Sequence, residues 1–140
     1  MTERSRLRLL LWRAGATRCA APIERLREVL PALPFTALPG APPSVLGVAN
    51  VRGTLVTIVD GRRLLGEEDR LVPDATVLVD LGGTPIGLAV DSVEDLVEVE
   101  DSELVPHGAG SAAGWEVRLE DGPPARLLDL DHLLEPLFRE

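Results

Sequence analysis

The stretch Ala75-Thr-Val-Leu-Val-Asp-Leu-Gly-Gly-Thr-Pro-Ile-Gly-Leu-Ala-Val-Asp91 decides the fold class of this chain. Two apolar runs rich in β-branched residues, 75–81 and 85–91, lie on either side of Gly82-Gly83. Two successive glycines can supply the positive φ angles that a tight hairpin turn requires. We therefore predict two antiparallel strands joined at these glycines.

Short strands separated by glycine-centred turns continue on both sides of this hairpin. The predicted strands are Arg6–Trp12, Thr17–Ile23, Val45–Asn50, Leu55–Asp60 and Val93–Val99, and a second hairpin joins Val117–Glu120 to Ala125–Leu130. Residues 22–30 combine strand and helix patterns, so their type stays open. Strands that recur every 8–12 residues indicate small barrels or a sandwich. The predicted fold class is all-β with minor helix.

Helix is expected only in short segments. Arg62–Leu65 suffices for one helical turn before Gly66, and the tail 129–138 carries leucines at helical spacing. Asp129 or Asp131 is the expected N-cap of the tail helix, and Pro136 should shorten it. Residues 31–43 contain five prolines, which exclude a central strand or a helix interior there.

Length and composition indicate one cytoplasmic domain with a sizeable core. The chain has 140 residues, 45% of them hydrophobic, which fits a single domain and excludes wholesale disorder. The chain has a single cysteine, Cys19, which excludes a disulfide framework within the chain. We predict that Cys19 is a small, buried hydrophobic residue. No apolar run reaches the roughly 18–20 residues of a membrane span, and we recognise no signal peptide.

The charge of the chain argues against a nucleic-acid partner. Fourteen basic residues, all arginine, stand against 23 acidic ones, for a net charge of −9. Binding to a phosphate backbone demands clustered positive charge, and stacking on bases demands aromatic residues, which make up only 3% of the chain. The excess of arginine in residues 1–30 indicates that one face of the N-terminal strands is exposed to solvent. A nucleic-acid-binding barrel is thus a disfavoured alternative.

No constellation of residues points to catalysis, a metal or a cofactor. His107, in a Gly-rich segment 106–114 expected to be a loop, is far in sequence from His132. Asp129 and His132 could share a helical face, but two ligands fall short of most metal sites, and a surface ion pair is the better interpretation. The acidic run 91–103 lacks the register of a calcium loop and reads as a solvated rim. A small barrel enzyme is therefore also disfavoured.

Several segments resemble the CheW-like domains of bacterial chemosensory proteins. Val45-Leu-Gly-Val-Ala-Asn-Val-Arg-Gly-Thr-Leu-Val-Thr-Ile-Val-Asp60 looks like that family's central signature, a G-V-x-N-x-R-G turn followed by a β-run ending in Asp. Residues 75–99 resemble its next hairpin and its V-D-x-V-x-D-V element. Segments 22–29, 39–42 and 127–134 also fit, so the resemblance covers nearly all of residues 7–135 in order.

This resemblance implies one domain, residues 1–140, made of two small five-stranded β-barrels packed around a shared core. It also implies a non-catalytic adaptor without cofactor, located in the cytoplasm at chemoreceptor clusters and not inserted in the membrane. Such an adaptor binds the cytoplasmic tip of a methyl-accepting chemoreceptor. It links that receptor to a CheA-type histidine kinase or, in a divergent form, uncouples the two.

The resemblance further assigns residues to a receptor-facing surface. Arg52 is expected to form a charge-assisted pair with Glu28, and this pair either shapes the receptor-facing surface or only ties the lobes together. Asn50 and Gly53 are expected to form the turn next to Arg52. Leu26 and Leu96 resemble residues that line the same surface, although either could equally belong to the core.

A kinase-facing edge is the second surface that the resemblance implies, with Gly47, Asp60 and Gly61 as its residues. Gly61 stands where the family commonly has leucine, so this edge is expected to be less filled. The segment between Pro106 and Trp115 is also short and rich in glycine and alanine. Both departures predict kinase binding that is weaker than receptor binding, or absent.

Overall fold

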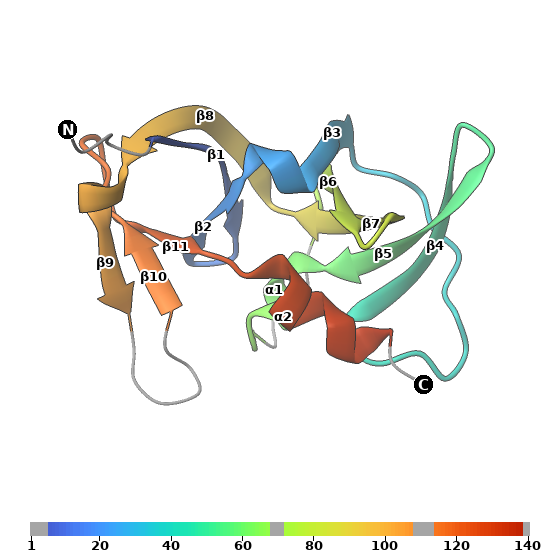
Figure 1. The fold of residues 1–140 in the computed structure, drawn as a ribbon. Helices are drawn as coiled ribbons and strands as arrows, with labels where there is room; N and C mark the ends of the chain where they lie inside the picture. Colours follow the sequence, from blue (N-terminus) through green and yellow to red (C-terminus); the bar gives the residue numbers. More distant parts are fainter. Residues whose placement is uncertain (1–5, 68–71, 108–113, 139–140) are drawn as a thin grey trace.

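The computed structural model describes residues 6–67, 72–107 and 114–138, which form two β-sheets with short helices (Figure 1). The six-stranded sheet has the order β8-β1-β2-β11-β10-β9, in which β1 is Arg6–Ala14, β2 Thr17–Pro22, β8 Ser92–Glu100, β9 Leu104–His107, β10 Gly114–Val117 and β11 Ala125–Leu127. The five-stranded sheet has the order β3-β6-β7-β5-β4, in which β3 is Leu26–Pro31, β4 Val45–Val51, β5 Thr54–Asp60, β6 Ala75–Leu81 and β7 Thr84–Val90. The helices are η1 (Ile23–Arg25), α1 (Gly61–Leu64), η2 (Asp101–Glu103), α2 (Leu130–Leu134) and η4 (Glu135–Leu137).

The predicted fold class, mostly β with minor helix, is confirmed. Gly82 and Gly83 have φ angles of 56° and 91°, and Leu81 pairs with Thr84 across the predicted hairpin. Residues 22–30, left open by the sequence, form η1 followed by β3. The described residues form one sheet of six strands and one of five, where the resemblance implied five strands in each barrel.

Two predictions about the C-terminal third were wrong. His107 ends a strand, β9, which pairs with β10; residues 108–113 of the expected loop lie outside the described residues. The hairpin partner of β11 is Gly114–Val117 rather than 117–120, because Trp115 and Val117 face Leu127 and Ala125. β11 also stops at Leu127, and the α2 helix begins after its N-cap, Asp129.

Strand β1 explains how the two sheets share a core. Leu9 and Leu11 point into an apolar cluster inside the six-stranded lobe, while Leu10, Trp12 and Ala14 point into a second cluster between the lobes. The second cluster also contains residues of β5, β6 and β7 and the two α2 residues Leu130 and Leu134. A third cluster lies inside the five-stranded lobe. Because the middle of β1 is buried on both faces, Leu9–Trp12 form a continuous apolar run rather than an alternating one.

Polar contacts add to this junction of the lobes. Asp91, just after β7, accepts hydrogen bonds from the backbone N–H of Gly15 (2.7 Å) and from Nε of Arg62 (3.1 Å). The hydrogen bonds from Arg62, together with the bond from Gly15, hold the pKa of the Asp91 carboxyl below its usual range. Nearby, burial raises the pKa of the Cys19 thiol to about 12, so Cys19 is the inert, buried residue that was predicted.

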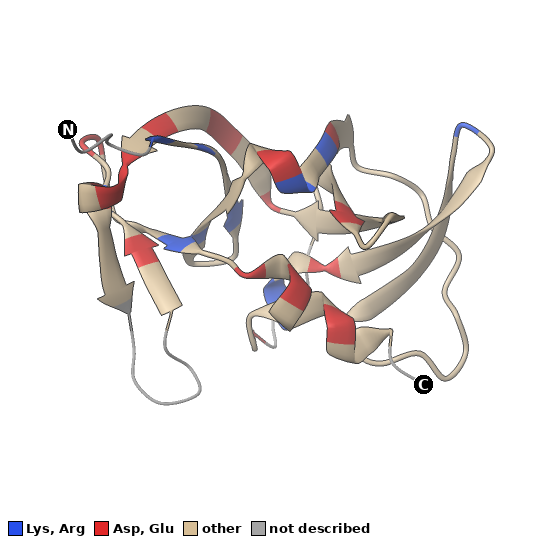
Figure 2. Ribbon diagram, viewed as in Figure 1, with Lys and Arg blue, Asp and Glu red and all other residues tan. Residues whose placement is uncertain are grey.

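The acidic run 91–103 is matched by the arginines of the N-terminal strands. β8 pairs with β1, and Figure 2 shows acidic residues along β8 beside basic ones on β1 and β2. Glu94 lies 2.9 Å from Arg18 and 3.6 Å from Arg13, and Glu98 lies 3.7 Å from Arg6. The described residues hold no group of three or more side chains suited to binding a metal ion. Within the same residues, no helix is long and apolar enough to cross a membrane.

Candidate functional site

The predicted turn after β4 forms the tip of an extended hairpin. Arg52 and Gly53 have φ angles of 50° and 87°, the two positive values of a two-residue hairpin turn. The side-chain oxygen of Asn50 accepts a hydrogen bond of 2.8 Å from the backbone N–H of Gly53. A positive φ is uncommon for a residue other than glycine, so the turn holds the Arg52 backbone in a specific orientation.

The guanidinium group of Arg52 makes the predicted pair with Glu28. Nη1 donates to Oε1 at 3.2 Å, and Nη2 donates to Oε2, so the pair is bidentate. The hydrogen bond from Arg52 lowers the pKa of Glu28, and the same contact raises the pKa of Arg52. The Arg52 side chain is 67% exposed, and that of Glu28 is 37% exposed.

This pair joins the two outer strands of the five-stranded sheet. Glu28 belongs to β3 and Arg52 follows β4, and these strands are the opposite ends of the hydrogen-bonded order. The sheet must therefore curl until its edges approach, as the right half of Figure 1 shows. Arg52 and Glu28 fasten these edges to each other while remaining accessible to a partner.

Leu26 and Leu96 occupy edge strands of different sheets. Leu26, at the start of β3, is partly buried against the core between the lobes. Leu96 lies on β8, opposite Leu10, and its residue is 60% exposed. Leu96 is thus a surface residue rather than part of the core. In Figure 1, β8 and β3 both run along the upper side of the molecule.

The three residues assigned to a kinase-facing edge are buried. Asp60 is only 3% exposed and caps α1 by accepting hydrogen bonds from the backbone N–H groups of Arg62 (2.9 Å) and Arg63 (3.3 Å). Its strand, β5, lies between β7 and β4 and is not an edge of the sheet. Asp60 therefore has a structural role in the junction between β5 and α1.

The expectation that Gly61 leaves an edge unfilled was wrong. A Cβ atom at Gly61 would lie 2.7 Å from the carbonyl oxygen of Ala89 and 3.2 Å from Cγ1 of Val90. The main chain of β7 and side chains of the core already occupy the space that a larger residue would need. Glycine is required here because the chain turns into α1 directly against β7.

Gly47 is buried beneath the proline-rich segment 31–43. Thr36 and Val48 form an isolated β-bridge with hydrogen bonds of 2.8 and 2.9 Å. A Cβ atom at Gly47 would lie 2.1 Å from the carbonyl oxygen of Thr36. Gly47 thus allows the segment to lie directly on β4.

Apolar side chains on the outside of the five-stranded lobe were missed by the sequence analysis. Phe35 and Leu38, in the segment that covers Gly47, are 40% and 44% exposed, and Leu55 beside the hairpin tip is 71% exposed. The signal was available, because these residues flank prolines and a turn, where a core position is not expected. Exposed apolar groups of this kind mark interaction surfaces when they gather on one face.

Fold and site together define a protein-binding domain. Two β lobes share a core, an exposed ion pair joins the outer strands of one sheet, and large apolar residues of the same lobe remain exposed.

Comparison with known proteins gives the family: residues 8–137 match the model of the CheW-like domain, and the chain belongs to that family. This membership confirms the resemblance inferred from the sequence and agrees with the non-enzymatic class that it implied.

Relatives and a solved structure support the assignment. The chain is 33% identical over 100 residues to the chemotaxis protein CheW of Rhizobium meliloti (strain 1021), covering 70% of this chain and 64% of that protein. It is 31% identical over 107 residues to protein FrzA of Myxococcus xanthus, covering 75% and 67%. The crystal structure of the scaffolding protein TtCheW from Thermoanaerobacter tengcongensis superposes with a TM-score of 0.82 at 18% identity, covering 94% of both chains. The chain thus matches less than two thirds of the length of the Rhizobium relative.

Proposed function

We propose that this chain is a non-catalytic adaptor of a chemosensory pathway, located in the cytoplasm at receptor clusters. It binds the cytoplasmic tip of a methyl-accepting chemoreceptor and links it to a CheA-type histidine kinase. The observation that supports this proposal most directly is the exposed, bidentate pair between Arg52 and Glu28, which joins the two outer strands of the five-stranded sheet. Relatives named as chemotaxis proteins support the pathway.

The proposed receptor surface combines this pair with aliphatic side chains. Leu96 is exposed on β8, and Leu26 is half-buried on β3, two residues before Glu28. A receptor helix with an apolar stripe and flanking charges can place the stripe on the leucines and its charges near Arg52 and Glu28. The strained turn and the second anchor on Glu28 restrict the Arg52 side chain before binding, which reduces the entropy that binding costs.

For the kinase, we propose a contact that differs from the expected edge at Asp60 and Gly61. Since both residues are buried, they cannot contact a partner in this structure. Phe35 and Leu38 are exposed in the segment that lies on Gly47, and they offer apolar surface to another domain. The reason for expecting weak kinase binding at Gly61 no longer applies, and we propose that kinase binding is retained.

Charge reversal at the pair tests the receptor surface. We expect Arg52→Glu and Glu28→Arg each to weaken binding to a purified receptor fragment by about tenfold or more, since each places like charges together and removes a charge recognised by the receptor. The double reversal re-forms an ion pair in the opposite direction. If the double variant has normal stability but still binds the receptor weakly, the receptor recognises the individual charges of Arg52 and Glu28.

A matched control lies on the same strand. Arg27 of β3 donates from Nε to Asp80 at 3.1 Å in another exposed ion pair. Reversing Arg27 and Asp80 should leave receptor affinity unchanged. Binding of the kinase regulatory domain, titrated separately, should survive all four single reversals. Full recovery of receptor binding in the Arg52→Glu, Glu28→Arg double variant would mean that the pair only ties the sheet edges, and the proposal would be wrong.

A further inference from the structure

Strand β8 contains one residue more than its pairing with β1 requires. Trp12 of β1 lies opposite Val93. The residue before it, Leu11, lies opposite Asp95, so Glu94 is the extra residue of a β-bulge. β8 is an outer strand of the six-stranded sheet, and it arches along the upper side of the molecule in Figure 1. A bulge bends its strand and redirects the side chains on either side of it.

This bulge determines which face of β8 carries Leu96. Residues directly opposite each other on paired strands share a face of the sheet. Val93 lies opposite Trp12 and packs against the core between the lobes. Leu96 lies opposite Leu10, another residue of that core, and is therefore on the same face. In a regular strand, residues three positions apart lie on opposite faces, so only the bulge allows Val93 and Leu96 to share one.

Core packing requires a bulge in β8 but does not determine its position. Val97 packs against the other cluster, inside the six-stranded lobe. Since Val93 and Val97 are four positions apart and face different clusters, one of the three residues between them must be extra. If Leu96 were the extra residue, Asp95 would take the place opposite Leu10. The position of the bulge therefore decides whether Leu96 lies beside the core between the lobes.

A largely buried arginine selects Glu94 as the extra residue. Nε of Arg18 donates to Oε1 of Glu94 at 2.9 Å, and Nη1 of Arg18 donates to the carbonyl oxygen of Pro123 at 2.9 Å. The Arg18 side chain is only 8% exposed, so its contact with Glu94 is little screened by solvent. Arg13 lies 3.6 Å from the same carboxylate. These contacts hold the Glu94 side chain on the arginines of β1 and β2 while its neighbours pair with β1.

We propose that Arg18 is a positioning residue for the receptor surface and acts through Glu94. By holding Glu94 as the extra residue, Arg18 keeps Leu96 beside the core between the lobes, where its 60% exposed residue is accessible to a receptor helix. Arg18 itself is too buried to contact a partner. This inference rests on the receptor role proposed above for Leu96.

NMR spectroscopy of the receptor-free protein tests the position of the bulge. We expect nuclear Overhauser contacts between Leu10 and Leu96 and between Leu9 and Val97, because each pair lies directly opposite across β1 and β8. In Arg18→Gln, the contact between Leu10 and Leu96 should weaken, and a second set of signals should appear for the residues around the bulge. The contact between Leu9 and Val97 is the internal control and should not change.

Titration against a purified receptor fragment connects the bulge with binding. Leu96→Ala should weaken binding about tenfold, as expected for the loss of an apolar anchor. Arg18→Gln should weaken binding by about threefold to tenfold, and no more than Leu96→Ala does, because Arg18 acts only through that leucine. In the Leu96→Ala background, Arg18→Gln should then cost less than about twofold. A merely structural role of Arg18 would give the same loss in both backgrounds.

Two further variants separate the bulge from a general loosening of the fold. Glu94→Gln keeps the bond from Arg18 to Pro123 and should reproduce both effects of Arg18→Gln, also where that variant fails to fold. Arg18→Gln and Glu94→Gln are thus two bulge variants. Arg62→Gln is the matched control, since it removes an arginine from another largely buried pair, with Asp91, outside the bulge. It should leave the NMR contacts of β8 and the receptor affinity unchanged.

An unchanged contact between Leu10 and Leu96 in both bulge variants, or an equal change in Arg62→Gln, would overturn the proposal. Additive losses of receptor affinity in the Arg18→Gln, Leu96→Ala double variant would also overturn it. If Leu96→Ala binds the receptor as well as the unchanged protein does, the receptor role of Leu96 is wrong, and the inference is wrong with it. The NMR contacts are measured without receptor, so a failure of the bulge argument is distinguishable from a failure of the proposed function.

Discussion

Substituting alanine for Gly61 should destabilise the junction of the lobes. The new Cβ would lie 2.7 Å from the carbonyl oxygen of Ala89 and 3.2 Å from Cγ1 of Val90. The Ala89 carbonyl belongs to β7, which is paired on both sides with β5 and β6, so it cannot move away without disturbing two strand pairings. Inserting one carbon into a close-packed site of this kind costs about 1–3 kcal/mol.

Helix propensity opposes part of this cost. Alanine is favoured over glycine by up to about 1 kcal/mol inside a helix, and Gly61 is the first residue of α1. We therefore expect the free energy of unfolding to fall by about 1–2 kcal/mol on balance, with steric overlap as the larger effect. Urea unfolding followed by far-UV circular dichroism measures this change, and the urea dependence should stay constant if the native fold is kept.

Gly114 provides the matched control. A Cβ atom there would meet no heavy atom of the described residues within 4 Å, and its φ is not in the positive range. Gly114→Ala should change stability by no more than about 0.5 kcal/mol. If Gly61→Ala is as stable as Gly114→Ala, the space around Gly61 is not filled as described, and the reasoning about this junction is refuted.

Three further predictions concern the pH dependence, the segment over Gly47 and the buried thiol. Because Arg62 lowers the pKa of Asp91, the stabilisation is complete above the ordinary carboxyl pKa of about 3.9 and is lost as pH falls through the lower folded value. Asp91→Asn should reduce the acid-side slope of the urea midpoint, to which Glu28 and Asp80 also contribute, and an unchanged slope would contradict this prediction. Gly47→Ala should displace the Thr36 main chain, so that a protease cleaves segment 31–43 faster than in the unchanged protein. Kinase binding should fall, while receptor binding should stay the same. Equal cleavage rates for the variant and the unchanged protein would refute this prediction. The Cys19 thiol is buried and its pKa is raised to about 12, so it should react with a disulfide reagent only at the rate of global unfolding. Fast labelling without denaturant would contradict the view that the whole domain unfolds as one cooperative unit.

Local patterns sufficed for much of the fold. The hairpin at Gly82-Gly83 was predictable because two glycines permit a turn that few other pairs allow. The exclusion of a central strand and of a helix interior from 31–43 held: Pro31 only ends the edge strand β3, and Thr36 forms one isolated bridge, because proline restricts the backbone whatever the tertiary context. The pairing of Arg52 with Glu28 came from the family resemblance, since the two residues are separated by 24 positions in the sequence and belong to different parts of the sheet, β3 and the turn after β4.

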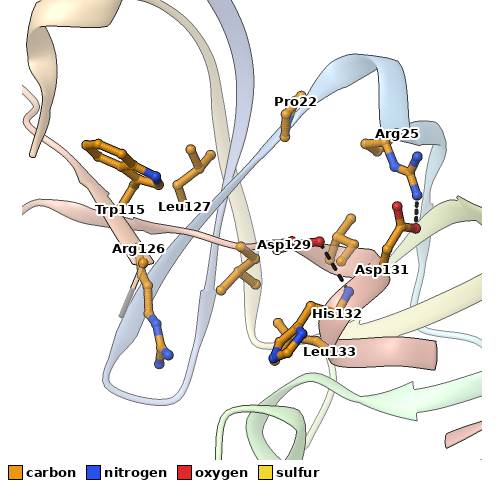
Figure 3. Close-up of a pocket in the computed structure, with 12 residues that line it drawn as sticks. Pro22, Arg25, Trp115, Arg126, Leu127, Asp129, Asp131, His132 and Leu133 are labelled. Carbon is orange, nitrogen blue, oxygen red and sulfur yellow. Dashed lines mark hydrogen bonds and ion pairs between the residues drawn. The ribbon is translucent and has the colours of Figure 1, made fainter. Parts of the chain in front are cut away.

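Tertiary context decided the parts that sequence reasoning missed. Strand β9 is short, contains Pro106 and becomes a strand only because β10 pairs with it. Gly61 was predicted to leave an edge less filled, because the sequence does not show that Ala89 of β7 lies directly against it. The groove between the β10–β11 hairpin and helix α2 (Figure 3) could not be predicted for a similar reason, because its shape depends on where the hairpin and the helix lie in the folded structure. At this groove, the predicted contact of Asp129 with His132 is a helix cap, with a hydrogen bond of 3.1 Å from the backbone N–H of His132, rather than a side-chain ion pair.

The placement of the strands in the chain has a consequence for synthesis on the ribosome. Every strand of the five-stranded sheet lies between residues 26 and 90, whereas β1 must wait for β8, whose residues begin at 92. At a typical 5–20 residues per second, roughly 4–16 s pass between the emergence of these two partners. During this interval the middle of the chain can complete its own sheet, but Leu9 and Leu11 of β1 still lack Val99, Val117 and Ala125, the later residues of their cluster. The nascent β1–β2 hairpin is thus the segment most exposed to chaperones and to aggregation. The lobe that begins with β1 and β2 is completed only when the last strands have been synthesised.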